Sequence, residues 1–198
     1  MSERRDWVRY YDEQEQREPR DLLLEALAPF EWEGRTGHAV ELGCGQGFDT
    51  AELLRRGWEV DAIDRSEEGI RRLRERIGDV GARLRTVVSR MEDAEIPSAD
   101  LVYASFSLPY CRPDAFPRLW SDVREAIRPG GRFAGQLFGD RDTWASTEDD
   151  MTFFDVASAR ALFDGIELES FVEEEDDGEA WGRTKHWHVF HAIARRPT

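Results

Sequence analysis

The sequence has almost no lysine and few cysteines. Lys185 is the only lysine among 198 residues, and the formal net charge is −15 at pH 7. Because binding to nucleic-acid phosphates or anionic membranes depends on a concentrated basic surface, this charge argues against both as main partners. The two cysteines, Cys44 and Cys111, have no C-x-x-C partner, so we expect free thiols and no structural zinc site.

Long apolar runs are also absent from the sequence. No run approaches the roughly 20 residues of a membrane-spanning helix. Residues 1–6 lead into no apolar signal core. We therefore expect a cytoplasmic protein, and the length predicts one domain over residues 1–198.

Glycine is concentrated where a short apolar run, beginning at His38, ends. Glu41 closes the run, and alternate glycines follow it, which predicts a strand that turns into a helix. These glycines are Gly43, Gly45 and Gly47. Glycine lets a ligand approach the backbone closely, although a tight turn without a ligand is the alternative. A P-loop would need Gly-Lys-Ser or Gly-Lys-Thr, and a dinucleotide fingerprint would need glycine at Phe48.

Two further apolar stretches are followed by acids. Residues 58–64 predict a second strand that ends in Asp64, about twenty positions after the first glycine, where a nucleotide-binding fold presents a carboxylate to ribose hydroxyls. An acid at a helix start is the alternative interpretation. Residues 84–88 predict a third strand, and Met91, Glu92 and Asp93 follow it.

The rest of the chain continues the alternation of strands and helices. Residues 166–172 and 186–194 are joined by an acidic loop without a helix, which predicts an antiparallel hairpin. The other expected elements are a helix over 22–30, a helix over 50–56, a helix beginning after Ser66, a strand over 99–104, a helix over 114–127, a strand over 132–139, a polar loop over 140–150 and a helix over 156–163.

The order of these parts resembles class I S-adenosylmethionine (SAM)-dependent methyltransferases. The shared features are E-x-G-x-G-x-G at the end of the first strand, the acids after the second and third, an Asp-Leu-Val strand, a Pro-Gly-Gly turn and the terminal hairpin. More narrowly, Tyr-Tyr-Asp, Ser-Leu-Pro-Tyr-Cys and Lys-His-Trp-His-Val-Phe are similar to the tellurite-resistance methyltransferase-like group. The resemblance covers about residues 20–196. It implies SAM as cofactor and an α/β, Rossmann-like three-layer sandwich, whose seven-stranded, mostly parallel sheet has the order 3-2-1-4-5-7-6 and a C-terminal antiparallel hairpin.

The resemblance also implies a set of cofactor-binding residues. Glu92 or Asp93 would accept from the adenine amine, and we prefer Glu92. The expected cofactor contacts are Glu41, Gly43, Cys44, Gly45, Gly47, Asp64, Arg65, Met91, Glu92, Asp93 and Ser105.

The acceptor side is expected to involve Tyr10, Leu108 and Tyr110, with residues 1–20 as a lid-like arm. The alternative is that the aromatic residues of this arm are docked core residues. The loop after the fourth strand reads Ser-Leu-Pro-Tyr where methyltransferases of nucleic-acid bases usually carry N-P-P-Y or D-P-P-Y. We therefore expect a small-molecule acceptor and no nucleic acid, in a monomer or a homodimer.

The expected reaction is an in-line displacement that needs alignment more than a catalytic side chain. If the acceptor needs a general base, the candidates are Tyr11, His186 and His188. His186 and His188 alternate on one strand, but no third ligand is evident, so we expect no metal. Two other functions remain open, a non-catalytic SAM-binding sensor or partner protein and a macromolecular methyltransferase.

Overall fold

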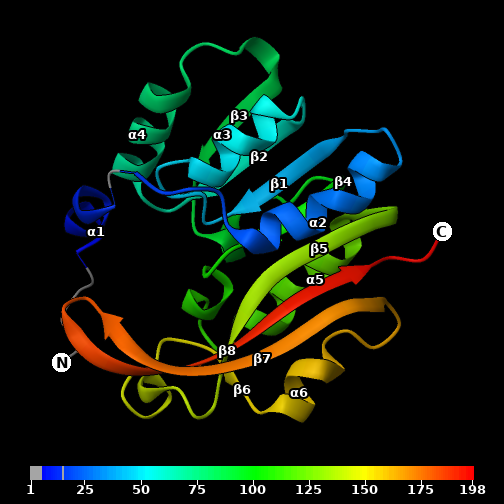
Figure 1. Ribbon diagram of the computed structural model, residues 1–198. Helices are drawn as coiled ribbons and strands as arrows, with labels where there is room; N and C mark the ends of the chain where they lie inside the picture. Colours follow the sequence, from blue (N-terminus) through cyan, green and yellow to red (C-terminus); the bar gives the residue numbers. More distant parts are fainter. Residues whose placement is uncertain (1–5, 15) are drawn as a thin grey trace.

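The computed structural model describes residues 6–14 and 16–198. Within these residues one eight-stranded sheet runs through the molecule in the order β3-β2-β1-β4-β5-β8-β7, and β6 pairs with β5 (Figure 1). The strands are β1 (His38–Leu42), β2 (Glu59–Asp64), β3 (Leu84–Val88), β4 (Ala99–Ala104), β5 (Ile127–Gly139), β6 (Phe153–Phe154), β7 (Glu167–Ala180) and β8 (Arg183–Arg195).

The sheet is parallel from β3 to β5 and antiparallel where β8 joins β5 and β7. The central strands are buried on both faces, as parallel strands require. The predicted Rossmann-like sheet with a terminal antiparallel hairpin is therefore confirmed. The structure adds the two-residue strand β6, which shifts the numbers of the last two strands.

Helices cover both faces of the sheet. The α-helices are α1 (Trp7–Glu13), α2 (Asp21–Trp32), α3 (Phe48–Arg55), α4 (Glu67–Ile77), α5 (Phe116–Ala126) and α6 (Val156–Ala161). The 3₁₀ turns are η1 (Gly81–Arg83), η2 (Met91–Asp93), η3 (Leu108–Tyr110) and η4 (Thr143–Ser146). Ser66 caps α4 by accepting a hydrogen bond from the backbone N–H of Gly69 at 3.0 Å.

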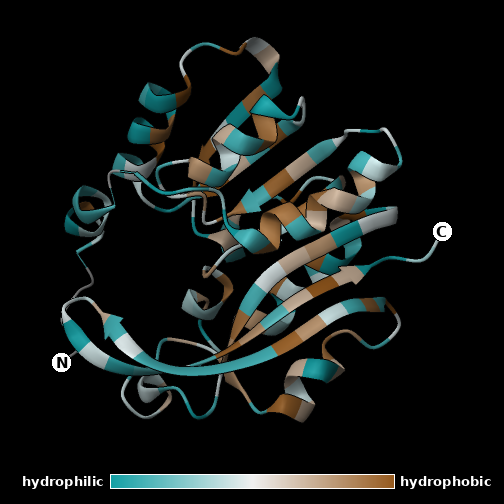
Figure 2. Ribbon diagram, viewed as in Figure 1, coloured by the Kyte–Doolittle hydropathy of each residue, from teal (hydrophilic) through white to brown (hydrophobic). Residues whose placement is uncertain are grey.

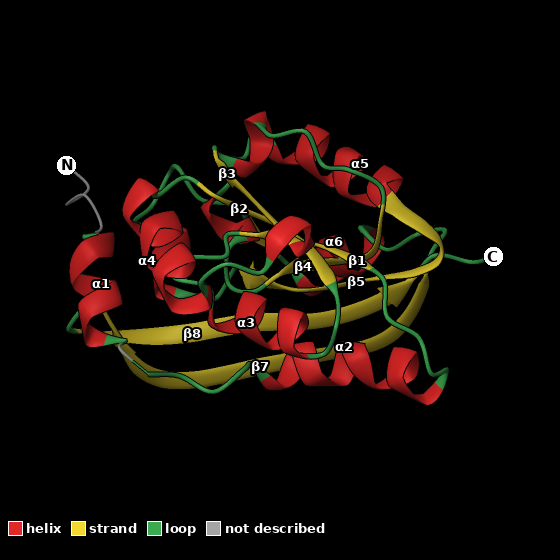
Figure 3. Ribbon diagram, turned by 90° about the horizontal axis from the view of Figure 1, so that it is seen from above, coloured by secondary structure: helices red, strands yellow, loops and turns green. Residues whose placement is uncertain are grey.

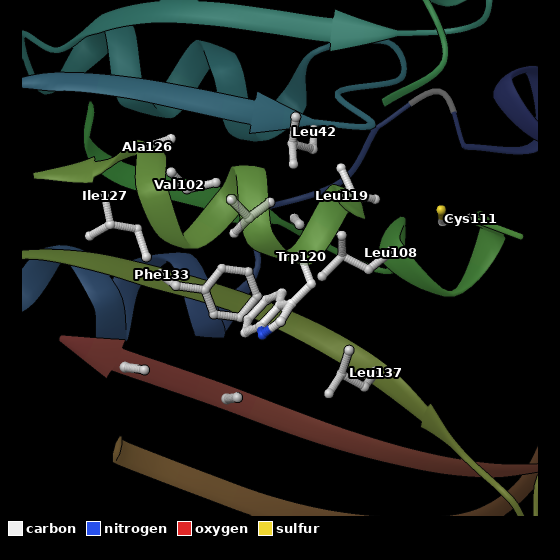
Figure 4. Close-up of a cluster of buried hydrophobic side chains, with 14 of the residues drawn as sticks. Leu42, Val102, Leu108, Cys111, Leu119, Trp120, Ala126, Ile127, Phe133 and Leu137 are labelled. Atoms are coloured by element: carbon white, nitrogen blue, oxygen red, sulfur yellow. The ribbon is translucent and has the colours of Figure 1, made fainter. Parts of the chain in front are cut away.

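Two buried clusters fill the space between these layers. One joins α5 and α6 to the sheet and includes Trp120 and Phe133, whose rings meet edge to face at 5.0 Å (Figure 4). The other joins α2, α3 and α4 to the opposite face and is centred on Leu27 and Trp58. Figure 3 shows α5 separated from α2 and α3 by the sheet. The carboxyl ends of the parallel strands thus meet between well-packed layers.

The β7–β8 hairpin extends beyond the rest of the sheet and reaches α1 (Figure 1). The half of the hairpin that lies toward α1 is strongly hydrophilic (Figure 2). Ala180 ends β7 and Arg183 begins β8, so Trp181 and Gly182 form a two-residue turn, with φ values of 56° and 71°. Positive φ is uncommon for a residue with a side chain, and it sets Trp181 against the helix.

Among the described residues, no helix has both the length and the apolar character needed to cross a membrane.

Candidate functional site

A cavity of about 780 Å³ opens where the carboxyl ends of β1, β2, β4 and β5 meet α1 and the β7–β8 hairpin. Ligands of open α/β sheets bind at this edge, where the strand order reverses. The volume lies within the range of small-molecule sites, roughly 300–1,000 Å³. The cavity is therefore the candidate active site.

The glycine-rich turn after β1 forms one wall. The backbone N–H groups of Gly43 and Cys44 both donate to the carbonyl of Ile63, at 2.8 and 3.1 Å, which ties the turn to β2. Gly43 has a φ of 78°, and a Cβ there would lie 2.3 Å from the Cβ of Ser107. A larger residue has no room at this position, so the backbone itself forms the wall.

Asp64 and Glu92 place carboxylates along the same wall. The Asp64 side chain accepts from the backbone N–H groups of Gly45 at 2.8 Å and Ser66 at 2.7 Å. Burial raises the pKa of Asp64, and these two hydrogen bonds oppose that shift. Glu92 is buried and accepts from Arg90 at 2.6 Å. Both carboxylates are held in fixed positions at the cavity.

Glu41 lies at the end of β1, close to a buried ion pair. Its carboxylate accepts from the Thr50 hydroxyl at 2.5 Å. Burial raises the pKa of Glu41 to about 8, and the nearby charge of Asp49 adds to that shift. Asp49 itself accepts from Arg17 at 3.0 and 3.1 Å. This end of the cavity therefore holds a carboxyl group that is mostly protonated at neutral pH.

Aromatic side chains surround the opposite part of the cavity. Trp181 at the hairpin tip contacts Trp7 and Tyr10 of α1, with ring centroids 5.1 and 5.3 Å apart. Tyr110 of η3 lies 5.2 Å from Trp7. Phe106 follows β4 with a φ of 49°, and its backbone N–H donates to the side chain of Gln136 at 3.0 Å. Segments far apart in the sequence thus form one aromatic wall.

Most of the predicted site residues line this one cavity. Glu92 lines it, whereas the side chain of Asp93 is 62% exposed and points away, so the geometry favours Glu92 of the two. The predicted residues that line the cavity are Tyr10, Tyr11, Glu41, Gly43, Cys44, Gly45, Asp64, Arg65, Met91, Glu92, Ser105 and Tyr110. Their individual roles stay predictions.

Three predicted positions need correction. Gly47 is the N-cap residue before α3 and lies outside the cavity, and it is glycine because a Cβ would lie 2.5 Å from Leu73. Asp93 leaves the cavity because η2 turns successive side chains in different directions. Leu108 is fully buried in the cluster beneath α5 (Figure 4), since η3 turns it inward and Tyr110 outward.

The predicted histidine bases also need correction. Successive residues of a strand face opposite sides, and β8 directs Trp187, Val189 and His191 into the cavity. His186 and His188 face the other side of the hairpin. There His186 contacts Asp177 at 2.7 Å, and this hydrogen bond raises the pKa of His186.

Tyr11 and the cysteines are poor proton acceptors or nucleophiles. Burial, followed by the charge of Asp64, raises the pKa of Tyr11, whose ring packs against Gly45. Burial raises the pKa of Cys44 and raises that of Cys111 to about 12. Both cysteines are free thiols, as predicted.

Glu173, Glu175 and His188 form a group whose ligand atoms lie within 4.8 Å of one another, close enough for a metal ion. The guanidinium of Arg141 already lies among them, 2.5 Å from each carboxylate and 3.1 Å from His188. Because this cation fills the role that an ion would have, the group supports no metal proposal. The predicted absence of a metal stays a prediction.

Several cavity residues were not predicted from the sequence. Arg17 and Arg20 precede the first strand, and the Arg20 guanidinium lies 4.7 Å from the ring of Phe106. Alternate residues of a strand face opposite sides, so the odd-numbered His191 lies on the face of β8 opposite to His186 and His188. This alternation was the one sequence feature that could have indicated His191. No local pattern pointed to the arginines or to Trp181.

A family comparison identifies the class of the central part of the chain. Residues 39–131 match a family model described as a methyltransferase domain. This segment runs from β1 to β5 and contains the glycine turn, Asp64 and Glu92. The match supports the predicted methyltransferase domain over this segment of the chain.

Individual proteins with similar sequence or structure carry related names. The chain is 36% identical over 112 residues to a protein from Claviceps purpurea that is named methyltransferase. The matched residues make up 55% of the chain. The chain spans about a third of the length of the curated relatives it matches, 34% in this case. TehB from Haemophilus influenzae superposes with a TM-score of 0.77 at 17% identity, over 94% of this chain and 65% of TehB. The N-methyltransferase NodS from Bradyrhizobium japonicum WM9, in complex with S-adenosyl-L-homocysteine (SAH), superposes with a TM-score of 0.68 at 15% identity. The superposition covers 98% of this chain and 89% of NodS.

Proposed function

We propose that the protein is a SAM-dependent methyltransferase acting on a small molecule. The observation that carries the proposal is one shared cavity, in which the glycine turn, Asp64 and Glu92 occupy one side and an aromatic wall lies opposite. NodS, a protein of the same fold, was solved in complex with SAH, the demethylated form of SAM. The methyltransferase domain match supports the same cofactor.

The residues present fit this cofactor. In the proposal, Asp64 accepts from ribose hydroxyls, Glu92 accepts from the adenine amine, and Gly43 gives the backbone room to approach the ligand. Arg20 Nε and Ser105 Oγ are buried and have no hydrogen-bond partner among residues 6–14 and 16–198. Such groups are costly unless a ligand or water satisfies them.

The reaction requires alignment above all. When bound, SAM would supply an electrophilic methyl group on its sulfonium. Transfer would form a bond from the acceptor to that carbon as the carbon–sulfur bond breaks and its electrons stay on sulfur. The rigid wall and the aromatic side chains hold the acceptor in line, which can contribute on the order of 7–11 kcal/mol. In this proposal residues 1–20 act as the predicted lid, although residues 1–5 and 15 lie outside the described residues. The support comes from α1, which lies along the cavity, and from Gln46 of the glycine turn, which donates to the carbonyl of Tyr11 at 3.1 Å.

The protonation of Glu41 gives a prediction about pH. Because ionised Glu41 attracts the ammonium of the methionine part of SAM, binding favours loss of its proton. The pKa of about 8 in the free protein then means that affinity rises with pH up to about 8, by at most about tenfold per pH unit. Calorimetry in buffers of different ionisation enthalpy should show release of close to one proton at pH 7. Glu41→Gln should bind without that release, and wild-type binding without proton release would contradict the prediction.

A screen with methyl-labelled SAM tests the proposed function. We expect transfer of label to an amine, thiol or phenol by the wild-type protein, and none in a reaction with heated protein. The competing function is a SAM-binding sensor or partner protein without transfer. SAM binding with no transfer to any class would favour the sensor, and absence of SAM binding would contradict both.

A further inference from the structure

We infer that the acceptor is an organic cation, a small molecule that carries a protonated amine beside a flat apolar body. This inference rests on the proposed function. It concerns the part of the cavity between the β7–β8 hairpin, α1 and η3. Carboxylates that form no ion pair with an arginine or lysine of the described residues occur there beside aromatic rings.

Carboxylates of β7 face the cavity. Glu174 and Asp176 lie on its inner face, and Glu179 lines the cavity near the hairpin tip. Among residues 6–14 and 16–198, no arginine or lysine forms an ion pair with these three. Glu174 lies 3.1 Å from Nε2 of His191, and Asp176 accepts only from the backbone N–H of Asp177, at 2.8 Å. Their charges are available to a ligand.

The opposite face of the same strand differs. Glu173 and Glu175 each lie 2.5 Å from the guanidinium of Arg141. Asp177 contacts His186 at 2.7 Å. On β7 the acids with close ionic partners are Glu173, Glu175 and Asp177, of which Asp177 also lines the cavity. Among the described residues, Asp176 and Glu179 form no ion pair, and Glu174 pairs only with His191.

The arginines that line the cavity belong mainly to the cofactor side. Arg17 pairs with Asp49, and Arg90 pairs with Glu92. Arg20 lies over Phe106, beside the glycine turn, and Arg65 lies 5.6 Å from the ring of Trp7. The charged side chains that the hairpin places in the cavity are the carboxylates of Glu174, Asp176, Asp177 and Glu179, which attract a cation and repel carboxylates, phosphates and metalloid oxyanions.

The aromatic wall suits the same ligand. The faces of tryptophan and tyrosine rings attract cations, and their large surfaces pack against flat apolar groups. The protein already binds one alkylammonium group in this way. The Nζ atom of Lys185 pairs with Asp142 and lies 3.7 Å from the ring of Trp187 and 4.2 Å from that of Trp144, and both rings also line the cavity.

A protonated nitrogen has no lone pair with which to attack a methyl group. The ammonium is therefore the group that orients the acceptor, and the attacking atom is another nucleophile of the same molecule. In this arrangement the carboxylates of β7 hold one end of the acceptor, and the methyl group is delivered at the other end, beside the glycine turn.

Three probes that share an indole ring and differ in charge test this inference. Tryptamine is a cation, tryptophol is neutral and indole-3-propionate is an anion. Calorimetry on protein saturated with SAH should show tryptamine binding about tenfold more tightly than tryptophol, the effect of one charged hydrogen bond. Indole-3-propionate should bind more weakly still.

Matched variants of β7 locate the effect. Asp176→Asn and Glu174→Gln should each bring the affinity for tryptamine toward that for tryptophol, without changing SAH affinity. Glu173→Gln removes one charge from the outer face and should keep the wild-type preference. Equal affinities, preference for the anion, or no tryptamine binding by protein that binds SAH would overturn the inference. Failure to bind SAH would instead overturn the proposed function.

Discussion

Replacing Lys185 by methionine should destabilise the folded protein by about 3–5 kcal/mol, the range found when one partner of a buried ion pair is removed. Lys185 is 2% exposed, and the side chain of Asp142, its ion-pair partner, is fully buried. Methionine fills a similar volume but leaves that carboxylate without its cation. For a chain of this size the melting temperature should fall by on the order of 10 °C. Urea unfolding, followed by circular dichroism, measures the loss.

A double variant separates charge from packing. Asp142 also accepts from the backbone N–H of Trp144 at 2.9 Å, and asparagine can keep that hydrogen bond. Lys185→Met combined with Asp142→Asn should therefore recover most of the stability lost by Lys185→Met alone, because no uncompensated charge stays buried. A loss below about 1 kcal/mol for the single variant, the size of an exposed ion pair, would show that this pair is not buried in solution.

The sequence could predict the cofactor side of the site because its residues directly follow strands. Glu41, Gly43 and Asp64 stand where apolar runs end, and the carboxyl ends of parallel strands meet at one edge of a sheet. Once the strands are recognised, the proximity of these residues follows from topology. The same reasoning located Glu92 only to within one residue, since η2 decides which of two adjacent acids turns inward.

The acceptor side depends on features that local patterns do not record. The hairpin was predicted, but both strands are longer than the apolar pattern indicated, with bounds of Glu167–Ala180 and Arg183–Arg195. Their polar outer halves have no apolar alternation, so the pattern did not predict which face meets the cavity. The predicted bases His186 and His188 therefore lie on the face away from the cavity, and His191, on the cavity face, was not among the predicted residues.

The contact between Trp181 and α1 joins the two ends of the chain. A pairing over such a separation is set by the whole fold and leaves no periodicity in either segment. The same holds for Leu108, where a single 3₁₀ turn exchanges the inner and outer side chains of a short loop. Sequence patterns decide which segments form elements, and the three-dimensional packing decides which side chains meet.

Replacing Asp64 by alanine should weaken SAM binding by at least about 100-fold. In the proposed function this carboxylate accepts from ribose hydroxyls, and charged hydrogen bonds contribute roughly 1.5–3 kcal/mol each. The substitution also removes the acceptor for the backbone N–H groups of Gly45 and Ser66, so the glycine turn loses a support as well. Calorimetry with SAM and with SAH measures the change.

The matched control is Glu59→Ala, which removes an exposed acid from the other end of β2 and should leave affinity unchanged. Unfolding curves of both variants show whether the loss reflects binding alone. If Asp64→Ala stays folded and its affinity for SAM lies within about threefold of wild type, Asp64 is not the ribose acceptor. Gly45 and Ser66 each donate to one oxygen of the Asp64 carboxylate and so fix its orientation. If Asp64→Ala keeps the native fold but binds SAM weakly, this fixed carboxylate positions the ligand.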